Sequence, residues 1–299
     1  MANNQNIIKK LQDQNLIHPP KWLSESLAFL GYGGSVSYGA SNDTSDMDCM
    51  GFCMPPKHIV FPYSVGGNIL GFDDVQRFNN WQEHHIQTPN KEYDFSVYNI
   101  VDFFKLATDN NPNILDLLFL PRRCILYTTK VGELVRENRK LFLHKGAMQK
   151  LRGYAFSQLS KIDNKANSKN PKRAADIEKN GYDTKFLMNV VRLTLQCENI
   201  LVEHDLDIER NSDILKSIRR GEWTLEYGKE WFAEKEKALE TLYANSTLQH
   251  SPDTKKIKEL LVECMEMTYG KLTNDLTIIP SIDRIIEDMQ NVLNKYKQN

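Results

Sequence analysis

Two aspartates one residue apart, Asp46 and Asp48, begin an apolar run over residues 46–54. Alternate residues of a strand project to the same face, so both carboxylates point the same way if this run is a strand. Asp94 adds a third carboxylate at the centre of a second alternating run, residues 92–100. Like charges side by side repel unless a cation lies between them, and hard carboxylate oxygens suit Mg²⁺ or Mn²⁺. We therefore expect a divalent-metal site; the alternative is a hairpin with a solvated, aspartate-rich turn.

A glycine-rich turn, Gly33-Gly34-Ser35, precedes the aspartate pair. Glycines let backbone amides come close to an anion, and the serine hydroxyl adds a hydrogen-bond donor. The turn is not a P-loop, because no Gly-Lys-Ser/Thr follows, and it is not a dinucleotide fingerprint, because a polar loop follows where a helix should begin. A triphosphate held by Gly34 and Ser35, and bridged by metal ions to Asp46 and Asp48, would have its α-phosphorus near Asp94. This arrangement predicts an in-line displacement at that phosphorus, assisted by two metal ions.

A second polar motif, Tyr-Asp-Thr-Lys at residues 182–185, lies far along the chain. Asp183 or the following threonine can cap the helix expected to follow. Lys185 falls in the first turn of that helix, where a cation opposes the helix dipole, so the β- and γ-phosphates of a ligand would give it a partner. A plain surface lysine is the alternative. Arg192 follows about two turns later on the same face and either helps the same site or pairs with Glu198 or another acid.

The cysteines and the adjacent histidines predict no second metal site. Five scattered cysteines are not a disulfide framework. Cys49 and Cys53 lie on the strand face opposite the aspartates, and no Cys or His follows them at zinc-ligand spacing, so we interpret them as buried thiols. His84 and His85 point different ways on a regular strand or helix, which favours a surface or interface role over metal binding.

The composition is that of an ordinary globular protein, with 40% hydrophobic and 26% charged residues among 299. No apolar run approaches the roughly 20 residues that span a bilayer, and the N-terminus does not resemble a signal peptide, so we expect a cytoplasmic protein without a membrane segment. The net charge is −1, yet residues 145–192 hold eleven Lys and Arg against four Asp and Glu. This basic 145–192 tract suggests an anionic ligand, RNA or a small molecule, with a solvated surface as the alternative.

The pattern of elements predicts an α+β fold, because the strands come first and the helices later. Residues 27–32 and 46–54 are expected to pair as a hairpin, and further strands are predicted at 92–100 and 122–127. A small mixed β-sheet core is thus followed by a mostly helical C-terminal half. Its helices are predicted at about 129–138, 146–162, 184–204, 211–219, 230–244, 254–269 and 282–297, with a polar, mobile segment between 162 and 183.

Several motifs together carry a resemblance to known proteins. They are Gly34-Ser35-Val36-Ser37-Tyr38-Gly39, Asp46-Met47-Asp48, Asn111-Pro112-Asn113, Gly153-Tyr154-Ala155-Phe156-Ser157-Gln158-Leu159, Gly181-Tyr182-Asp183-Thr184-Lys185 and Arg192-Leu193. The glycine turn and the aspartates resemble the DNA polymerase β-type nucleotidyltransferase superfamily. A closer similarity, over about residues 28–203, is to a group of predicted nucleotidyltransferases of bacteria and tailed phages that includes proteins proposed to act in RNA repair. The group leads us to expect a histidine shortly after Lys185, where this chain has Asn189.

The resemblance implies transfer of a nucleoside monophosphate from an NTP such as ATP to a hydroxyl of RNA, a small molecule or a protein. Residues 1–127 would form the nucleotidyltransferase core, with an irregular insertion at about 55–90, and residues 128–299 a helical domain that completes the site. The location would be the cytoplasm, or the host cytoplasm if the chain is phage-encoded. The implied residues are Asp46, Asp48 and Asp94 for catalysis and two Mg²⁺ or Mn²⁺ ions, and Gly34, Ser35, Tyr38, Tyr182, Asp183, Lys185 and Arg192 for the nucleotide. A non-catalytic nucleotide-binding regulator or toxin–antitoxin-type protein on the same fold is the alternative; the acceptor and the oligomeric state stay open.

Overall fold

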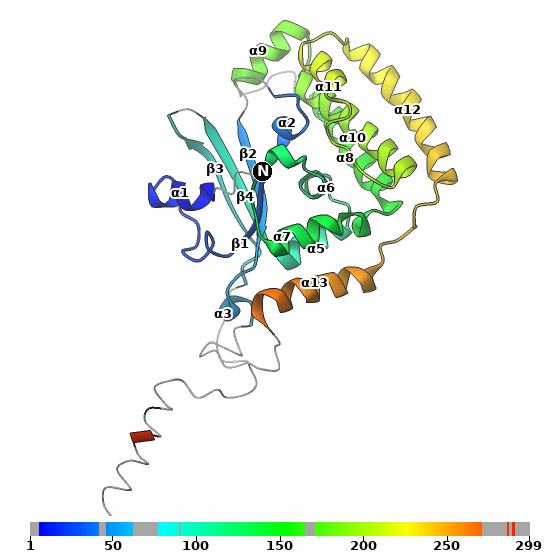
Figure 1. Cartoon of the computed structure of the whole chain (residues 1–299). Helices are drawn as coiled ribbons and strands as arrows, with labels where there is room; N and C mark the ends of the chain where they lie inside the picture. The colour runs from blue at the N-terminus through cyan, green and yellow to red at the C-terminus, as the bar shows by residue number, and fades with distance from the viewer. Residues whose placement is uncertain are drawn as a thin grey trace, which may run out of the picture.

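A five-stranded sheet and the helices around it make up the computed structural model (Figure 1). The structure describes residues 6–41, 46–61, 77–89, 91–164 and 171–270, together with residues 286, 289 and 290. The strands are β1 (Leu27–Tyr32), β2 (Met47–Cys53), β3 (Asn80–Gln87), β4 (Glu92–Asn99) and β5 (Ile125–Thr128). Their order across the sheet is β3-β4-β2-β1-β5.

The sheet is mixed, and its one parallel pair lies at the centre. β1 pairs antiparallel with both β2 and β5, and β3 pairs antiparallel with β4, whereas β2 and β4 run parallel. The predicted hairpin of the first two strands is confirmed, and β1 has the bounds expected from the sequence. This parallel pair places Asp48 directly beside Asp94.

Alternation along the strands gives the sheet two faces with separate apolar clusters. Cys49, Cys53 and Phe95 pack on one face with residues of α1 (Ile7–Asp13), and all three are fully buried. Phe52 packs on the other face, where it stacks on Phe103 at a ring distance of 4.5 Å. Asp48, Met50 and Phe52 alternate with the cysteines, so the predicted burial of the thiols away from the aspartates is confirmed.

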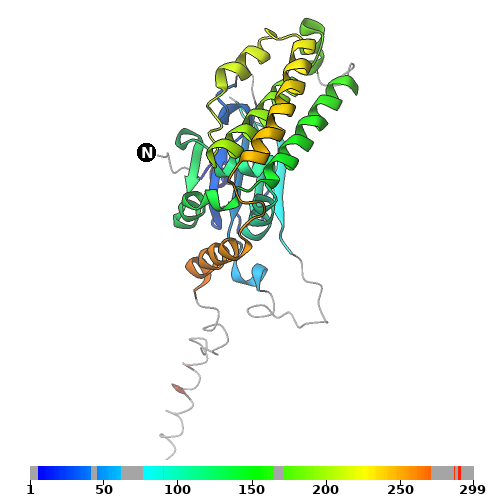
Figure 2. The same ribbon diagram turned by 90° about the vertical axis from the view of Figure 1, so that its right-hand side faces the viewer.

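Helices cover the second face and continue into the C-terminal half (Figures 1 and 2). They are α2 (Gly34–Ser37), α3 (Lys57–Val60), α5 (Ile100–Thr108), α6 (Pro112–Leu118), α7 (Lys130–Glu137), α8 (Gly146–Asn164), α9 (Pro171–Asn180), α10 (Thr184–Glu203), α11 (Ser212–Arg219), α12 (Leu225–Asn245) and α13 (Thr254–Tyr269). In both views α8, α10 and α12 run alongside one another, and α10 contacts both of the other two. The α+β class with a helical second half is therefore confirmed.

Local chemistry explains where several helices begin. The Asn99 side chain accepts a hydrogen bond from the Asp102 amide at the start of α5, and Asn111 accepts one from the Asn113 amide at the start of α6. Pro112 occupies the first turn of α6, where its missing N–H would have no helical partner. Thr129 and Thr224 cap α7 and α12 in the same way.

Two expectations about irregular segments are corrected where the structure describes them. Residues 80–87 form the edge strand β3, although the polar stretch around them predicts an irregular insertion. Residues 171–180 form α9, although few of them are apolar. Residues 62–76, 90, 165–170 and most of the predicted helix at 282–297 lie outside the described residues. No helix in the described part of the chain is long and apolar enough to cross a membrane. The division at residue 127 stays a prediction.

Candidate active site

Asp48 and Asp94 lie directly opposite each other on the parallel strands β2 and β4. Both point to the sheet face that the helices cover, because Asp48 alternates with Cys49 and Asp94 alternates with Phe95. Asp46 precedes the first residue of β2 and lies close enough to act electrostatically on Asp48. The structure thus brings together the three carboxylates that the sequence predicts.

Gly34 places the glycine turn against this carboxylate pair. Its φ of +57° lies in the left-handed region, and an added Cβ would lie only 2.0 Å from Asp48 Oδ2. The Gly33 amide donates to the Asp48 carbonyl oxygen at 2.7 Å, which extends the β1–β2 ladder into the turn. Ser35 lies half-buried in the single-turn α2 that follows. A side chain at position 34 is therefore excluded by both backbone conformation and space.

A cavity of about 210 Å³ opens between the glycine turn, the two strands and α6. Its volume is below the roughly 300–1,000 Å³ of pockets that enclose a whole small molecule, so it can enclose only part of a larger ligand. The described residues that line it are Gly33, Gly34, Tyr38, Asp48, Cys49, Met50, His84, Asp94, Ser96, Asn113, Asp116 and Leu117.

The charge of Asp48 is unfavourable in the protein without a ligand. Burial raises the pKa of Asp48, and the neighbouring carboxylates of Asp94 and Asp46 raise it further. Lys185 and His84 lower this pKa, because a positive charge favours the carboxylate. Lys185, 137 residues away along the chain, therefore lies within electrostatic reach of Asp48, and its contact with phosphates stays a prediction.

A bulge in β3 brings two histidines to the carboxylate face. Glu83 pairs with Phe95 and Ile86 with Tyr93, so both His84 and His85 lie opposite Asp94. The His85 amide donates to Asp94 Oδ1 at 2.7 Å, and His84 Nδ1 lies 3.6 Å from the same oxygen. The expectation that the two histidines point different ways assumes a regular strand, whereas in the bulge the His84 imidazole lies near Asp94 and the His85 imidazole contacts Glu92.

Arg192 and Tyr38 belong to a buried polar network beside the cavity. Asp116 of α6 accepts hydrogen bonds from Tyr38 Oη at 2.5 Å, Arg192 Nη1 at 2.7 Å and Gln196 Nε2 at 2.7 Å. The Arg192 guanidinium also lies 4.5 Å from the centre of the Tyr38 ring. All four side chains are buried, and Arg192 pairs with an acid, as the second of its two sequence-based interpretations expects; its contact with a nucleotide stays a prediction.

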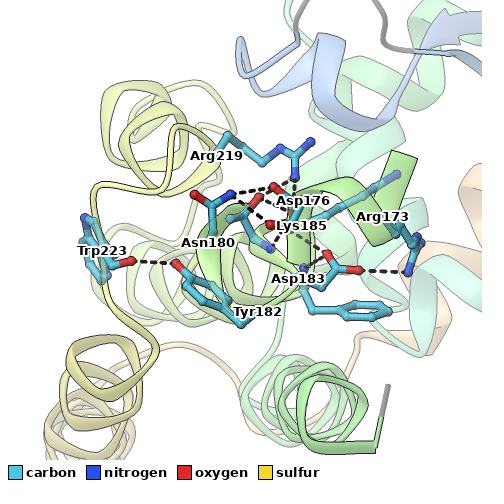
Figure 3. Close-up of polar contacts among 10 residues, drawn as sticks. Arg173, Asp176, Asn180, Tyr182, Asp183, Lys185, Arg219 and Trp223 are labelled. Carbon is cyan, nitrogen blue, oxygen red and sulfur yellow. Dashed lines mark hydrogen bonds and ion pairs between the residues drawn. The ribbon is translucent and has the colours of Figure 1, made fainter. Parts of the chain in front are cut away.

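The motif at residues 182–185 builds the start of α10 (Figure 3). Asp183 Oδ1 accepts from the amides of Lys185 and Phe186, and Tyr182 Oη donates to the Trp223 carbonyl oxygen at 2.8 Å. Tyr182 and Asp183 are buried and do not line the cavity, whereas the Lys185 side chain is exposed. The predicted helix cap is confirmed, and the nucleotide roles of these residues stay predictions.

A carboxylate of α9 strengthens the same helix start, which the sequence does not reveal. Asp176 Oδ2 accepts from both the Thr184 amide and the Thr184 hydroxyl at 2.8 Å, and Arg219 Nη1 donates to Thr184 Oγ1 at 2.7 Å. These contacts hold the backbone of the first turn of α10, which carries Lys185. Asn189, at the position where a histidine is expected, donates to Gln158 Oε1 at 3.4 Å.

Several charges of the basic 145–192 tract are neutralised within the protein. Arg152 pairs with Glu236 and Glu240, and Lys145 donates to the Tyr243 carbonyl oxygen at 2.9 Å. Arg173 pairs with Asp183. The described basic side chains of the tract that are exposed are Lys150, Lys161, Lys179 and Lys185.

A larger cavity, about 530 Å³, lies at another edge of the sheet, between α3, α5 and α13. Among the described residues that line it, apolar side chains such as Phe61, Phe78 and Tyr269 predominate. Its one carboxylate among these residues, Asp102, accepts a hydrogen bond from Asn99 at 2.7 Å. Among its described lining residues, the larger cavity therefore lacks the converging carboxylates of the smaller one.

The residues around Asp48 and Asp94 fit a divalent cation. The carboxylates share one face, and the raised pKa of Asp48 shows that the surrounding positive groups do not fully compensate its charge. Within the described residues, no three His, Cys, Asp or Glu side chains are already arranged to hold a metal ion. Mg²⁺ commonly takes one or two carboxylates and completes its shell with substrate phosphates and water, which suits a site that has its carboxylates beside a phosphate-sized cavity.

Comparison with known proteins identifies a family, a phage relative and a solved structure. Residues 8–263 match RlaP, the RNA repair pathway DNA polymerase beta family. Over 132 residues the chain is 27% identical to the uncharacterized 38.9 kDa protein in the nrdC-mobD intergenic region of Enterobacteria phage T4, a match that covers 44% of this chain and only 37% of the phage protein. A nucleotidyltransferase-like protein from Exiguobacterium sibiricum superposes with a TM-score of 0.29 and 7% identity, over 87% of this chain and 79% of that one.

The glycine turn gives a matched pair of substitutions. Gly34→Ala is expected to lower the free energy of unfolding by at least about 1–2 kcal/mol, since it adds left-handed strain and a clash with Asp48. Gly33→Ala is the control, because Gly33 has an ordinary φ of −93° and its added Cβ would meet the flexible Met50 side chain at 3.4 Å. Urea unfolding measures both; equal losses would contradict the close approach of Gly34 to Asp48.

α10 carries one buried and one exposed basic residue, and their substitutions are expected to have different effects on stability. Arg192→Leu leaves Asp116 buried without its cation and is expected to cost about 3–5 kcal/mol of unfolding free energy. Lys185→Leu, on the exposed first turn, is expected to change it by less than about 0.5 kcal/mol. Urea unfolding followed by circular dichroism compares the two variants. A small effect of Arg192→Leu would rule out the buried ion pair.

Asp48→Asn is expected to stabilise the metal-free protein at neutral pH. Because the native pKa of Asp48 is raised, the native state binds a proton more tightly than the unfolded chain, so the carboxylate destabilises the fold increasingly as pH rises above 3.8. The advantage of the variant should thus be absent near pH 3 and present at pH 7. Thermal unfolding in EDTA measures it, with the exposed Asp213→Asn as control; a variant less stable than wild type at pH 7 would contradict the unfavourable charge of the buried Asp48.

Proposed function

The chain belongs to the RNA repair pathway DNA polymerase beta family, and on that premise we propose that it is a nucleotidyltransferase. It transfers a nucleoside monophosphate from an NTP to a hydroxyl group. The acceptor oxygen forms a bond to the α-phosphorus, the bond from that phosphorus to the oxygen of the β-phosphate breaks, pyrophosphate leaves, and the hydroxyl proton passes to solvent water. The observation that carries this proposal is the registered pair Asp48 and Asp94, which faces the Gly34 turn across a small cavity.

Asp46, Asp48 and Asp94 are the residues that hold divalent cations in this proposal. When bound, two such cations stabilise the charge on the attacking and leaving oxygens. The protein contributes rigid placement: Asp94 is fixed by the His85 amide at 2.7 Å, and Asp48 is fixed by the strand pairing on both sides of β2. Rigid carboxylates need no reorganisation when the charge on the phosphate changes.

The phosphates are bound from two directions. On one side, Gly34 leaves its backbone open to an anion, and the Ser35 hydroxyl can donate a hydrogen bond. On the other side, Lys185 supplies an exposed ammonium on a helix start that Asp183 and Asp176 hold in place. Tyr38, which follows α2, and Arg192 both donate hydrogen bonds to Asp116 and so hold the glycine turn in place. In this proposal they are positioning residues for the nucleotide.

The acceptor proposed here is an RNA end, in keeping with the family's description. Lys150, Lys161 and Lys179 remain exposed on α8 and α9, next to the helix that carries Lys185. They can bind the phosphate backbone of a nucleic acid, whereas the arginines Arg152 and Arg173 pair with acids. In this proposal the helical half binds the acceptor, and the sheet carries the aspartates of the transfer reaction.

Incorporation of labelled nucleotide tests the function. The protein is incubated with each α-labelled NTP, Mg²⁺ or Mn²⁺, and separate RNA, protein and metabolite fractions. The wild type is expected to label the RNA fraction, and Asp48→Asn or Asp94→Asn to lower the rate about 100-fold or more, while Asp213→Asn has no effect. Label in another fraction, and none in RNA, would refute RNA as the acceptor but not the transferase activity. NTP binding without transfer to any fraction would refute the transferase in favour of a nucleotide-binding regulator.

A further inference from the structure

The bulge in β3 places a histidine side chain beside the proposed metal site. Regular pairing would set one residue of β3 against Asp94, but His84 and His85 share that position. The left-handed φ of +59° at His85 allows the extra residue, and both imidazoles consequently reach acids on the same face of β4, Asp94 and Glu92. Bulges next to active sites re-aim side chains in this way.

The two histidines have different surroundings. His85 Nδ1 contacts Glu92 Oε1 at 2.7 Å, its side chain is 80% exposed, and it does not line the cavity. His84 lines the cavity with Asp48 and Asp94, and its side chain is half exposed. His84 Nδ1 lies 3.6 Å from Asp94 Oδ1, which is longer than a hydrogen bond. Two ligand atoms on one octahedral ion lie roughly 3 Å apart, so a small rotation of the exposed imidazole suffices to share an ion with Asp94.

We propose that His84 is a metal ligand beside Asp94 and that it makes this site select Mn²⁺ over Mg²⁺. The proposal rests on the proposed function, because it assumes that Asp48 and Asp94 hold the cation. Mn²⁺ shares the preference of Mg²⁺ for carboxylate oxygens, but as a first-row transition metal it binds an imidazole nitrogen more readily than Mg²⁺ does. A site made of aspartates alone would accept both ions. The nitrogen of His84 adds affinity for Mn²⁺ and little for Mg²⁺.

Electron paramagnetic resonance of bound Mn²⁺ tests this directly, without any turnover. Spin-echo modulation by nitrogen-14 reports an imidazole coordinated to the ion. The wild type is expected to show this modulation and His84→Ala to lose it, with Mn²⁺ affinity falling about tenfold and Mg²⁺ affinity, measured by competition, changing less than about twofold. His85→Asn is the matched control, because asparagine tolerates a left-handed backbone, and it is expected to keep the modulation.

Each outcome decides one claim. Modulation that persists in His84→Ala, or is absent from the wild type, overturns the assignment of His84, as does an equal fall in the affinities for both ions. Asp48→Asn and Asp94→Asn separate this failure from failure of the proposed function. If they abolish Mn²⁺ binding while His84→Ala does not change it, the carboxylate site stands and the histidine ligand is refuted. If they leave binding unchanged, the metal site of the proposed function is refuted as well.

Discussion

The burial of Asp48 beside a second carboxylate is the electrostatic constraint that the site has to satisfy. Burial raises the pKa of Asp48, and the strand register, which sets Asp94 beside it on the adjacent parallel strand, raises it further. The surrounding elements supply positive charge or N–H groups in return: the His85 amide and His84 imidazole from the edge strand, and the Lys185 ammonium from α10. The partners of the carboxylate pair therefore come from distant parts of the chain.

Asp116 shows how the same fold treats a carboxylate that is part of the framework. It lines the same cavity, yet a phenol, a guanidinium and a side-chain amide all donate to it. Its hydrogen-bonding capacity is largely used within the protein, so it fixes α2 and α10 relative to α6. The contrast with Asp48 separates the acid that holds the site together from the acid that needs a ligand, although the sequence presents both simply as aspartates near apolar residues.

Local patterns predict much of this structure, and contacts between distant residues limit the prediction. The bounds of β1, the alternation that separates Asp48 from Cys49, and the cap of α10 at Asp183 all follow from neighbouring residues. The strand β3 does not, since its polar face reflects an edge position and its bulge breaks the alternation that marks a strand. The pairing of Arg192 with Asp116 joins residues on different helices, and a motif shows the charge of the arginine without showing its partner.

The parallel pairing of β2 with β4 also dictates when the site appears during synthesis. A nascent chain that has emerged only through the β1–β2 hairpin carries Asp48 and the glycine turn, but it lacks the strand that supplies Asp94. Lys185 emerges later still, with most of the helical half. Non-local pairings of this kind form slowly, after their loops close. The proposed active site is therefore complete only once the ribosome has delivered almost two thirds of the chain, and a product truncated before Lys185 lacks part of it.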